Sequence, residues 1–255
     1  THVDMDHLGG LLYNLRNKRK ICIEEVWMNH GRLMGKNTDL AVKHNDELYT
    51  RLKEQNIPVK AAAAGTTYEL DGAVFRILWP DEKALCQLFG ESAEDVLLEK
   101  HSDYGYSFDE LMEMPIKRRD TSPSNRVSVV MEIEYKGHEI LFTGDAWSED
   151  ILRVAGNTTY DLIKLPHHGS VRNISEEWCG RIKCKNYMIC TDGISHPDKQ
   201  TIAKLLKWND EITVYGSTDW WKDMLIVGDE EKLEKIHFKE GEYLWELPDI
   251  KQSIN

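Results

Sequence analysis

The sequence contains no run of about 18 apolar residues, so it predicts no transmembrane helix. Its five cysteines are an odd number and form no C-x-x-C pair, which favours reduced thiols in the cytoplasm over a disulfide framework. Basic residues are in the minority, with 32 Lys and Arg against 44 Asp and Glu. The net charge of −12 argues against a broadly basic nucleic-acid-binding surface but is compatible with a local basic rim.

The sequence also lacks an initiator Met, and Thr1 directly precedes an unusual cluster of His and Asp residues. We therefore expect the native N-terminus to lie further upstream, which leaves open whether a signal peptide precedes this chain. The 255 residues are enough for one large domain or two small ones.

Hydrophobic patterns predict hairpins in the first half of the chain and alternating strands and helices in the second. Strands are expected at 21–28, 59–65, 160–166, 186–190 and 211–216, and hairpins at 68–80, 126–145 and 235–247. Helices are expected after His7, from Trp147, and over 46–56, 175–182 and 199–208. This order predicts an α/β fold with helices outside a pair of sheets. The polar stretch 81–122, with helical patches at 94–101 and 108–114, is interpreted as an insertion or lid within one domain, 1–255.

Side chains that bind cations gather where predicted strands end. His2, Asp4, Asp6 and His7 precede the first helix, Asp145 follows "ILFTG", His167 and His168 follow "DLIKLP", and His196 follows "YMIC". Each residue alone has an ordinary explanation: Asp6 can cap a helix, and a single His is commonly structural. H-x-D-x-D-H in one loop is harder to explain, because its acids repel one another unless a cation gathers them. Open α/β sheets also place ligand sites at such strand ends. The pattern therefore predicts a metal site.

The motifs in order resemble those of the metallo-β-lactamase fold hydrolases, and more narrowly the branch of DNA-uptake competence proteins, ComEC/Rec2. The matching stretches are "THVDMDHLGG", "LFTGD", "IKLPHHGS" and "SHPDKQTIAKLL". The resemblance implies a four-layer αββα sandwich, with the family's first N-terminal strands missing from this chain. The sequence lacks two histidines of the wider family. Asp4 stands where the family has one, and the region 123–130, where a second is usual, holds Asn125 and Ser128 but no His.

The resemblance also implies a dinuclear metal hydrolase. Asp145 is expected to bridge two divalent ions, with Asp6 and His7 on one ion and His2 and Asp4 on the other. His196 and one of His167 and His168 would complete the shells, and the other imidazole would act as general acid; the sequence does not choose between the two. Asp6, His167 and His168 are thus the expected catalytic residues. Because carboxylate oxygens favour harder ions, Mn²⁺ rivals Zn²⁺ as the cofactor.

The expected reaction is phosphodiester hydrolysis by a metal-activated water, with nucleic acid as a possible substrate. Candidate substrate contacts are Lys164, Ser170, Asn125, Ser128, Arg172 and the basic stretch 117–119. A strand lysine and a solvated charge run are the plainer explanations for Lys164 and for 117–119. Two alternatives stay open. One is hydrolysis of a small ester, lactone or phosphocholine-type substrate beneath a lid; the other is a subunit completed by a protein partner or by a second copy of the chain.

Overall fold

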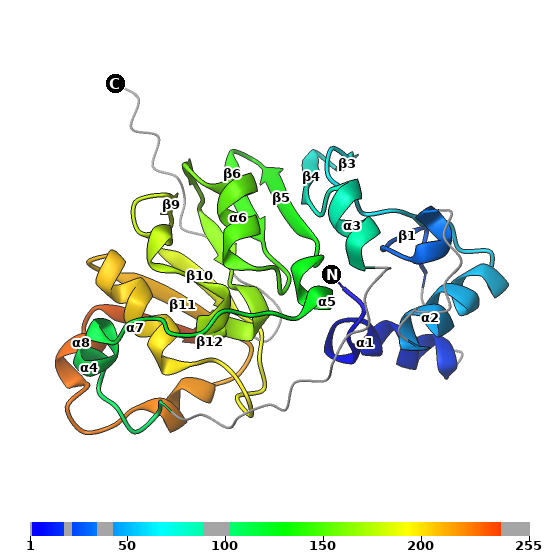
Figure 1. Cartoon of the computed structure of the whole chain (residues 1–255). Coiled ribbons are helices and arrows are strands. Elements are labelled where there is room, and N and C mark those ends of the chain that lie inside the picture. The colour runs from blue at the N-terminus through cyan, green and yellow to red at the C-terminus, as the bar shows by residue number, and fades with distance from the viewer. Residues whose placement is uncertain (1, 18–21, 35–42, 89–102, 241–255) are drawn as a thin grey trace.

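The computed structural model describes residues 2–17, 22–34, 43–88 and 103–240. An eight-stranded mixed sheet with strand order β12-β11-β10-β8-β6-β5-β4-β3 forms its centre (Figure 1). The strands are β3 (Thr67–Leu70), β4 (Ala73–Trp79), β5 (Val130–Tyr135), β6 (His138–Phe142), β8 (Leu162–Lys164), β10 (Asn186–Ile189), β11 (Ile212–Gly216) and β12 (Ile236–Glu240). Strands β3 to β6 are antiparallel, and β6, β8, β10, β11 and β12 are parallel. The change from hairpins to parallel strands is therefore confirmed.

Both central hairpins turn where the sequence predicts. Asp71 and Gly72 have φ of 49° and 83°, and Lys136 and Gly137 have φ of 51° and 80°. Two successive residues with positive φ form the turn whose twist matches that of paired strands, and glycine adopts this conformation without steric cost.

The helices are α1 (Met5–Arg16), α2 (Lys43–Glu54), α3 (Glu82–Leu88), α4 (Phe108–Glu113), α5 (Pro123–Arg126), α6 (Ser148–Ala155), α7 (Lys199–Trp208) and α8 (Glu230–Leu233). The helices predicted after His7, over 46–56, from Trp147 and over 199–208 correspond to α1, α2, α6 and α7. The helix predicted over 175–182 is wrong. Only a 3-10 turn, Glu176–Trp178, forms there, because buried Trp178 donates to Ser148 Oγ and Gly180 turns the chain at a φ of 74°.

Short strands complete the described structure. β1 (Val26–Trp27) pairs in parallel with β2 (Val59–Lys60), and β7 (Thr158–Thr159) pairs with β9 (Ile182–Lys183). The strands predicted at 21–28 and 59–65 are thus present only as two-residue pieces. Of the C-terminal hairpin predicted at 235–247, β12 is present as the parallel neighbour of β11, and residues 241–247 lie outside the described residues.

The described residues form three hydrophobic clusters, the smallest of which consists of Leu162, Met188 and Tyr215. The large core is formed by residues of the main sheet and of the helices packed on it. A small core of Leu8, Leu12, Leu15, Leu48 and Leu52 joins α1 to α2. In Figure 1, α1 and α2 lie to the right of the parallel strands.

The described part of the stretch 81–122 packs onto the body of the protein. Phe108 and Leu111 of α4 are fully buried in the large core, and the backbone N–H of Phe108 donates to Asp229. The Asp229 carboxylate also accepts from Lys199 of α7. The helical patch predicted at 94–101 lies outside the described residues, so the interpretation of this stretch as a lid stays a prediction.

The mixed α/β class is confirmed. In the described ranges there is one large sheet, accompanied by two sheets of two strands each. The four-layer arrangement and the missing first strands stay predictions. No helix in the described part of the chain is both long and apolar enough to span a bilayer.

Candidate metal centre

The candidate site lies at the carboxyl ends of the parallel strands. Phe142 of β6 pairs with Lys164 of β8, and Lys164 pairs with Met188 of β10. The loops that follow these three strands therefore leave the sheet at one edge. They carry Asp145 after β6, His167 and His168 after β8, and His196 after β10. The N-terminal end of α1 faces this edge and adds the fourth group of side chains.

Asp145 is the centre of this cluster. Its Oδ2 oxygen lies 3.2 Å from Nε2 of His7. The Nε2 atoms of His167 and His168 are each 3.9 Å away, and that of His2 is 4.0 Å away. The Asp145 side chain is only 2% exposed. A single buried carboxylate oxygen thus faces four imidazole nitrogens that come from two distant parts of the chain.

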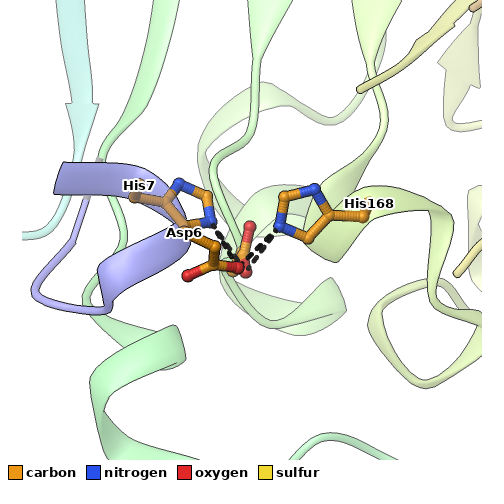
Figure 2. Close-up of side chains that lie close together, drawn as sticks. Asp6, His7 and His168 are labelled. Carbon is orange, nitrogen blue, oxygen red and sulfur yellow. Dashed lines mark hydrogen bonds and ion pairs between the residues drawn. The ribbon is translucent and has the colours of Figure 1, made fainter. Parts of the chain in front are cut away.

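Four of these residues form a group that can hold a metal ion. One ligand atom from each of Asp6, His7, Asp145 and His168 lies within 4.8 Å of all the others. Figure 2 shows Asp6, His7 and His168 converging, and His168 Nε2 is 3.0 Å from Asp6 Oδ2. Ligands 2.0–2.1 Å from a tetrahedral ion are about 3.3 Å apart, so these spacings fit a metal centre.

The backbone of the PHHG segment points both histidines at Asp145. His167 and His168 adopt φ of 47° and 54°, a left-handed backbone conformation that residues other than glycine rarely adopt. His167 N–H donates to Gly144 O, and the carbonyl of Gly169 accepts from Thr201 Oγ1. These bonds tie the strained segment to the neighbouring loop and to α7. Strain of this kind is common at functional sites.

The second ring nitrogen of His168 fixes its tautomer. Nδ1 lies 2.6 Å from the carbonyl oxygen of Cys190, which accepts only, so Nδ1 carries the proton. Nε2 is then the ring nitrogen that faces the carboxylates of Asp6 and Asp145, at 3.0 and 3.9 Å. A carbonyl that orients a histidine in this way is typical of metal ligands.

The electrostatics of the site suit a cation. Burial raises the pKa of Asp145, but His7, Lys164 and His167 outweigh this and hold it well below its ordinary value. Burial lowers the pKa of His168, whereas Asp6, Asp145 and the Cys190 carbonyl raise it, for a net increase. Burial lowers the pKa of His7, only partly offset by Asp145, so His7 is a neutral imidazole. A neutral imidazole and ionised carboxylates are the forms that bind metal.

His167 differs from His168 in its partners. Its Nδ1 lies 3.1 Å from Oδ1 of Asn173 and 3.4 Å from both Oδ2 of Asp120 and Nδ2 of Asn125. Asp120 and Asn173 were not predicted as site residues. Asp120 ends the run "KRRD", which the sequence presents as an ordinary solvated charge cluster, and no motif marks either residue. The contact exists because the segment before α5 runs past the 3-10 turn η3 (Val171–Asn173), where Asp120 N–H donates to Arg172 O.

The remaining predicted ligands lie near the group but outside it. His2 Nε2 is 3.2 Å from Asp4 Oδ2, and Asp4 is the N-cap of α1 without a capping bond from its side chain. Its carboxylate is thus turned to His2. The His196 ring packs edge-on against His167, with ring centroids 4.9 Å apart, and its Nδ1 lies 4.0 Å from Asp198. The ligand roles of His2, Asp4 and His196 stay predictions.

Four of the predicted substrate contacts, Lys164, Ser170, Asn125 and Ser128, are buried. Lys164 donates to Gly144 O and lies 3.7 Å from Asp145 Oδ1, so it balances charge below the site. Ser170 Oγ accepts from Arg172 N–H, and Asn125 donates to Asp120. Ser128 is fully buried beyond α5. Direct contact of these residues with a substrate stays a prediction, since the bonds observed serve the shape of the site.

An exposed basic segment directly precedes one residue of the site, Asp120, in the sequence. Lys117, Arg118 and Arg119 are exposed and immediately precede Asp120, which contacts His167. Arg119 also lies 3.5 Å from Glu149. A local basic rim therefore exists on a protein whose net charge is −12.

Comparison with known proteins adds little. No protein-family model matches the chain, and no curated protein matches it either. A solved structure of Igni18, a metallo hydrolase from the hyperthermophilic archaeon Ignicoccus hospitalis, is similar over 95% of this chain and 74% of that chain. The TM-score is 0.36 and the sequence identity 12%. Similarity at this level carries no argument, so the proposals that follow rest on the side chains of this chain.

Proposed function

We propose that the protein is a metal-dependent hydrolase that cleaves phosphodiesters. The observation that supports it best is the Asp145 carboxylate oxygen surrounded by four imidazole nitrogens within 4.0 Å. Asp6, His7 and His168 would hold one divalent ion, and His2 and Asp4 a second, with Asp145 between them. Oxygen and imidazole donors together suit Zn²⁺ or Mn²⁺.

Two divalent ions in such a site lower the pKa of water and neutralise the negative charge of a phosphate. The residues of the chain supply the rest of the chemistry. Asp145 and Lys164 keep the ligand set charged and fixed, and the Cys190 carbonyl holds the proton of His168 on Nδ1, so that Nε2 is the nitrogen turned toward an ion.

His167 is the general acid in this proposal. Burial lowers its pKa, but Asp120, Asp145 and Asn173 raise it above its ordinary value, which favours the protonated imidazole that a general acid needs. In the reaction, the oxygen of water bonds to phosphorus and the bond from phosphorus to the leaving oxygen breaks. His167 Nε2 gives its proton to that oxygen and regains one from the attacking water. The products are a phosphate monoester and an alcohol.

The basic segment at Lys117–Arg119 favours an anionic substrate over a neutral ester or lactone. It directly precedes Asp120, whose carboxylate contacts the acid His167. Arg and Lys on an exposed loop can bind phosphate oxygens without closing the site.

The test is a comparison of substrates with the metal-free chain reloaded with Mn²⁺ or Zn²⁺. Bis-p-nitrophenyl phosphate, p-nitrophenyl acetate, and single- and double-stranded DNA are supplied at equal concentrations of ester bonds. The proposal expects metal-dependent release of p-nitrophenolate from the phosphodiester. Hydrolysis of p-nitrophenyl acetate without hydrolysis of bis-p-nitrophenyl phosphate or DNA would overturn the proposal.

A further inference from the structure

A pocket of about 140 Å³ opens beside the candidate metal centre. His2 and His7 form one of its walls, and apolar side chains from α1, β1 and α2 form most of the others, among them Leu11, Val26 and Leu48. Apart from the two imidazoles, none of the described residues that line it carries a charge. A space that touches the metal ligands and is otherwise apolar is unlike a phosphate-binding groove.

The two amides in the pocket wall are already engaged. Asn29 donates through Nδ2 to the Ala62 carbonyl and accepts through Oδ1 from the Ala62 N–H. Asn45 is buried, and its Nδ2 donates to the Asn29 carbonyl. These bonds join α2 to the β1–β2 edge and hold the wall rigid. Both amides therefore shape the pocket instead of offering a sugar or a base its hydrogen bonds.

The volume sets the size of the occupant. An apolar protein cavity of about 150 Å³ holds one benzene molecule, so this pocket accommodates a single six-membered ring or a short alkyl chain. A nucleoside with its sugar exceeds that volume.

The position of the pocket relative to the general acid, His167, indicates which part of the substrate binds in it. His167 donates to the leaving oxygen in the proposed reaction and is not among the residues that line the pocket. His2 and His7 line it, whereas none of the described residues that line it belongs to the loop that carries His167. A group that fills the pocket is therefore joined to phosphorus on the side away from the leaving group.

We infer that the substrate is a small phosphodiester whose retained ester group is compact, uncharged and apolar, and that this group binds between α1, β1 and α2. The inference rests on the proposed function and narrows it, since it favours a small molecule over a nucleic-acid polymer.

The first test varies the retained group while the leaving group stays p-nitrophenolate. Methyl, phenyl, naphthyl and thymidine 5′ p-nitrophenyl phosphates are compared by kcat/KM with the metal-loaded protein. Burial of a ring predicts that the phenyl ester exceeds the methyl ester by about tenfold to a hundredfold. Equal values for phenyl and methyl, or a thymidine ester preferred over both, would overturn the inference.

A matched pair of variants locates the effect. Val26→Trp places a large ring in the pocket, whereas Val59→Trp places the same ring on the paired residue of β2, which does not line it. We expect Val26→Trp to reduce the phenyl-to-methyl ratio of kcat/KM at least fivefold, and Val59→Trp to keep the wild-type ratio. Leu11→Ala enlarges the pocket and should raise the naphthyl-to-phenyl ratio, which provides a test if the tryptophan variant does not fold. An unchanged ratio in folded Val26→Trp and in Leu11→Ala contradicts the inference.

A binding measurement separates this inference from the proposed function. Fluorobenzene binding to the protein as purified is followed by ¹⁹F NMR, which needs no turnover. Binding that is present in wild type and in Val59→Trp but lost in Val26→Trp supports the apolar pocket even if no phosphodiester is cleaved. Phosphodiester cleavage without fluorobenzene binding leaves the proposed function standing and removes the apolar subsite.

Discussion

Oδ2 of Asp120 lies 3.4 Å from Nδ1 of His167, on the side of the ring opposite Asp145. Burial would raise the pKa of this aspartate, but His167, Asn125 and Asn173 hold it below its ordinary value. The ionised carboxylate in turn raises the pKa of His167. Each member of the pair therefore favours the charged form of the other at the edge of the candidate metal centre.

Asp120→Asn should lower the pKa of His167 and shift the pH profile of kcat. A general acid is active when protonated, so activity falls as pH rises through its pKa, and a lower pKa moves that fall to lower pH. A shift of about one unit corresponds to about tenfold lower activity on the alkaline limb.

Asp161→Asn is the matched control for this change, because Asp161 Oδ2 lies 3.5 Å from Nδ1 of His138 at the other end of β6. It should leave the profile unmoved. A profile that is the same in Asp120→Asn and wild type would remove His167 from the role of acid.

Asp145→Asn should abolish metal binding and reduce phosphodiester turnover by at least about a hundredfold, the scale on which loss of a metal-site residue acts. The amide nearly keeps the shape of the carboxylate but cannot balance the charge of divalent ions. Elemental analysis after dialysis and the shift of melting temperature on addition of EDTA measure the loss. Asp210→Asn, at an exposed position, is the control. Retention of two ions per chain by Asp145→Asn would show that Asp145 is not the bridge.

Asp4→His should move the metal preference from Mn²⁺ toward Zn²⁺. The wild-type set around Asp4 is rich in oxygen donors, which accept Mn²⁺, whereas an added imidazole favours Zn²⁺. Titration of metal-free wild type and variant with each ion, followed by phosphodiester turnover, gives the ratio of activities. An identical ratio in both proteins would place Asp4 outside the coordination shell, as a partner that orients His2.

Gly169→Ala should destabilise the protein more than Gly72→Ala does. Both glycines have φ near +85°, but a Cβ at residue 169 would lie 2.8 Å from Cβ of Pro197, whereas at residue 72 it would meet nothing within 4 Å. The left-handed conformation costs about 1–2 kcal/mol in either variant. The overlap adds about 1–3 kcal/mol at residue 169. Denaturant unfolding measures the difference in the free energy of unfolding. Equal losses in the two variants would mean that the backbone of the PHHG segment shifts at no cost.

Asp229→Asn should lower the free energy of unfolding by about 3–5 kcal/mol, because it leaves buried Lys199 without its counter-ion. The two side chains are 1% and 0% exposed, with Nζ 2.6 Å from Oδ2. Asp219→Asn breaks a pair of the same length, 2.6 Å, with exposed Lys222 and should leave stability unchanged. A small loss in Asp229→Asn would show that water reaches Lys199.

The sequence predicted those parts of the molecule that depend on local pattern. The two hairpins, α7 and the strands on either side of it follow from periodicity and turn residues, which act over a few neighbours. The site was predicted because His and Asp stand at strand ends, and parallel strands bring such ends together.

The predictions that failed concern features that depend on residues distant in the sequence. The turn at Glu176–Trp178 is set by burial of Trp178 against α6, which no local pattern shows. Asp120 belongs to the site because its loop runs past His167 in the folded structure. The charged run in which Asp120 stands does not indicate this contact.

The candidate ligands belong to two separately packed cores. His7 lies on α1, which joins the small core, whereas Asp145 and His168 follow strands of the large one. An ion held by all three would close a loop of chain from residue 7 to residue 145, as a covalent cross-link does, and would reduce the entropy of the unfolded chain accordingly. A partly folded chain possesses only half of the ligands. The proposed metal centre is thus complete only when the two cores have packed together, so the proposed chemistry would begin only once folding is complete.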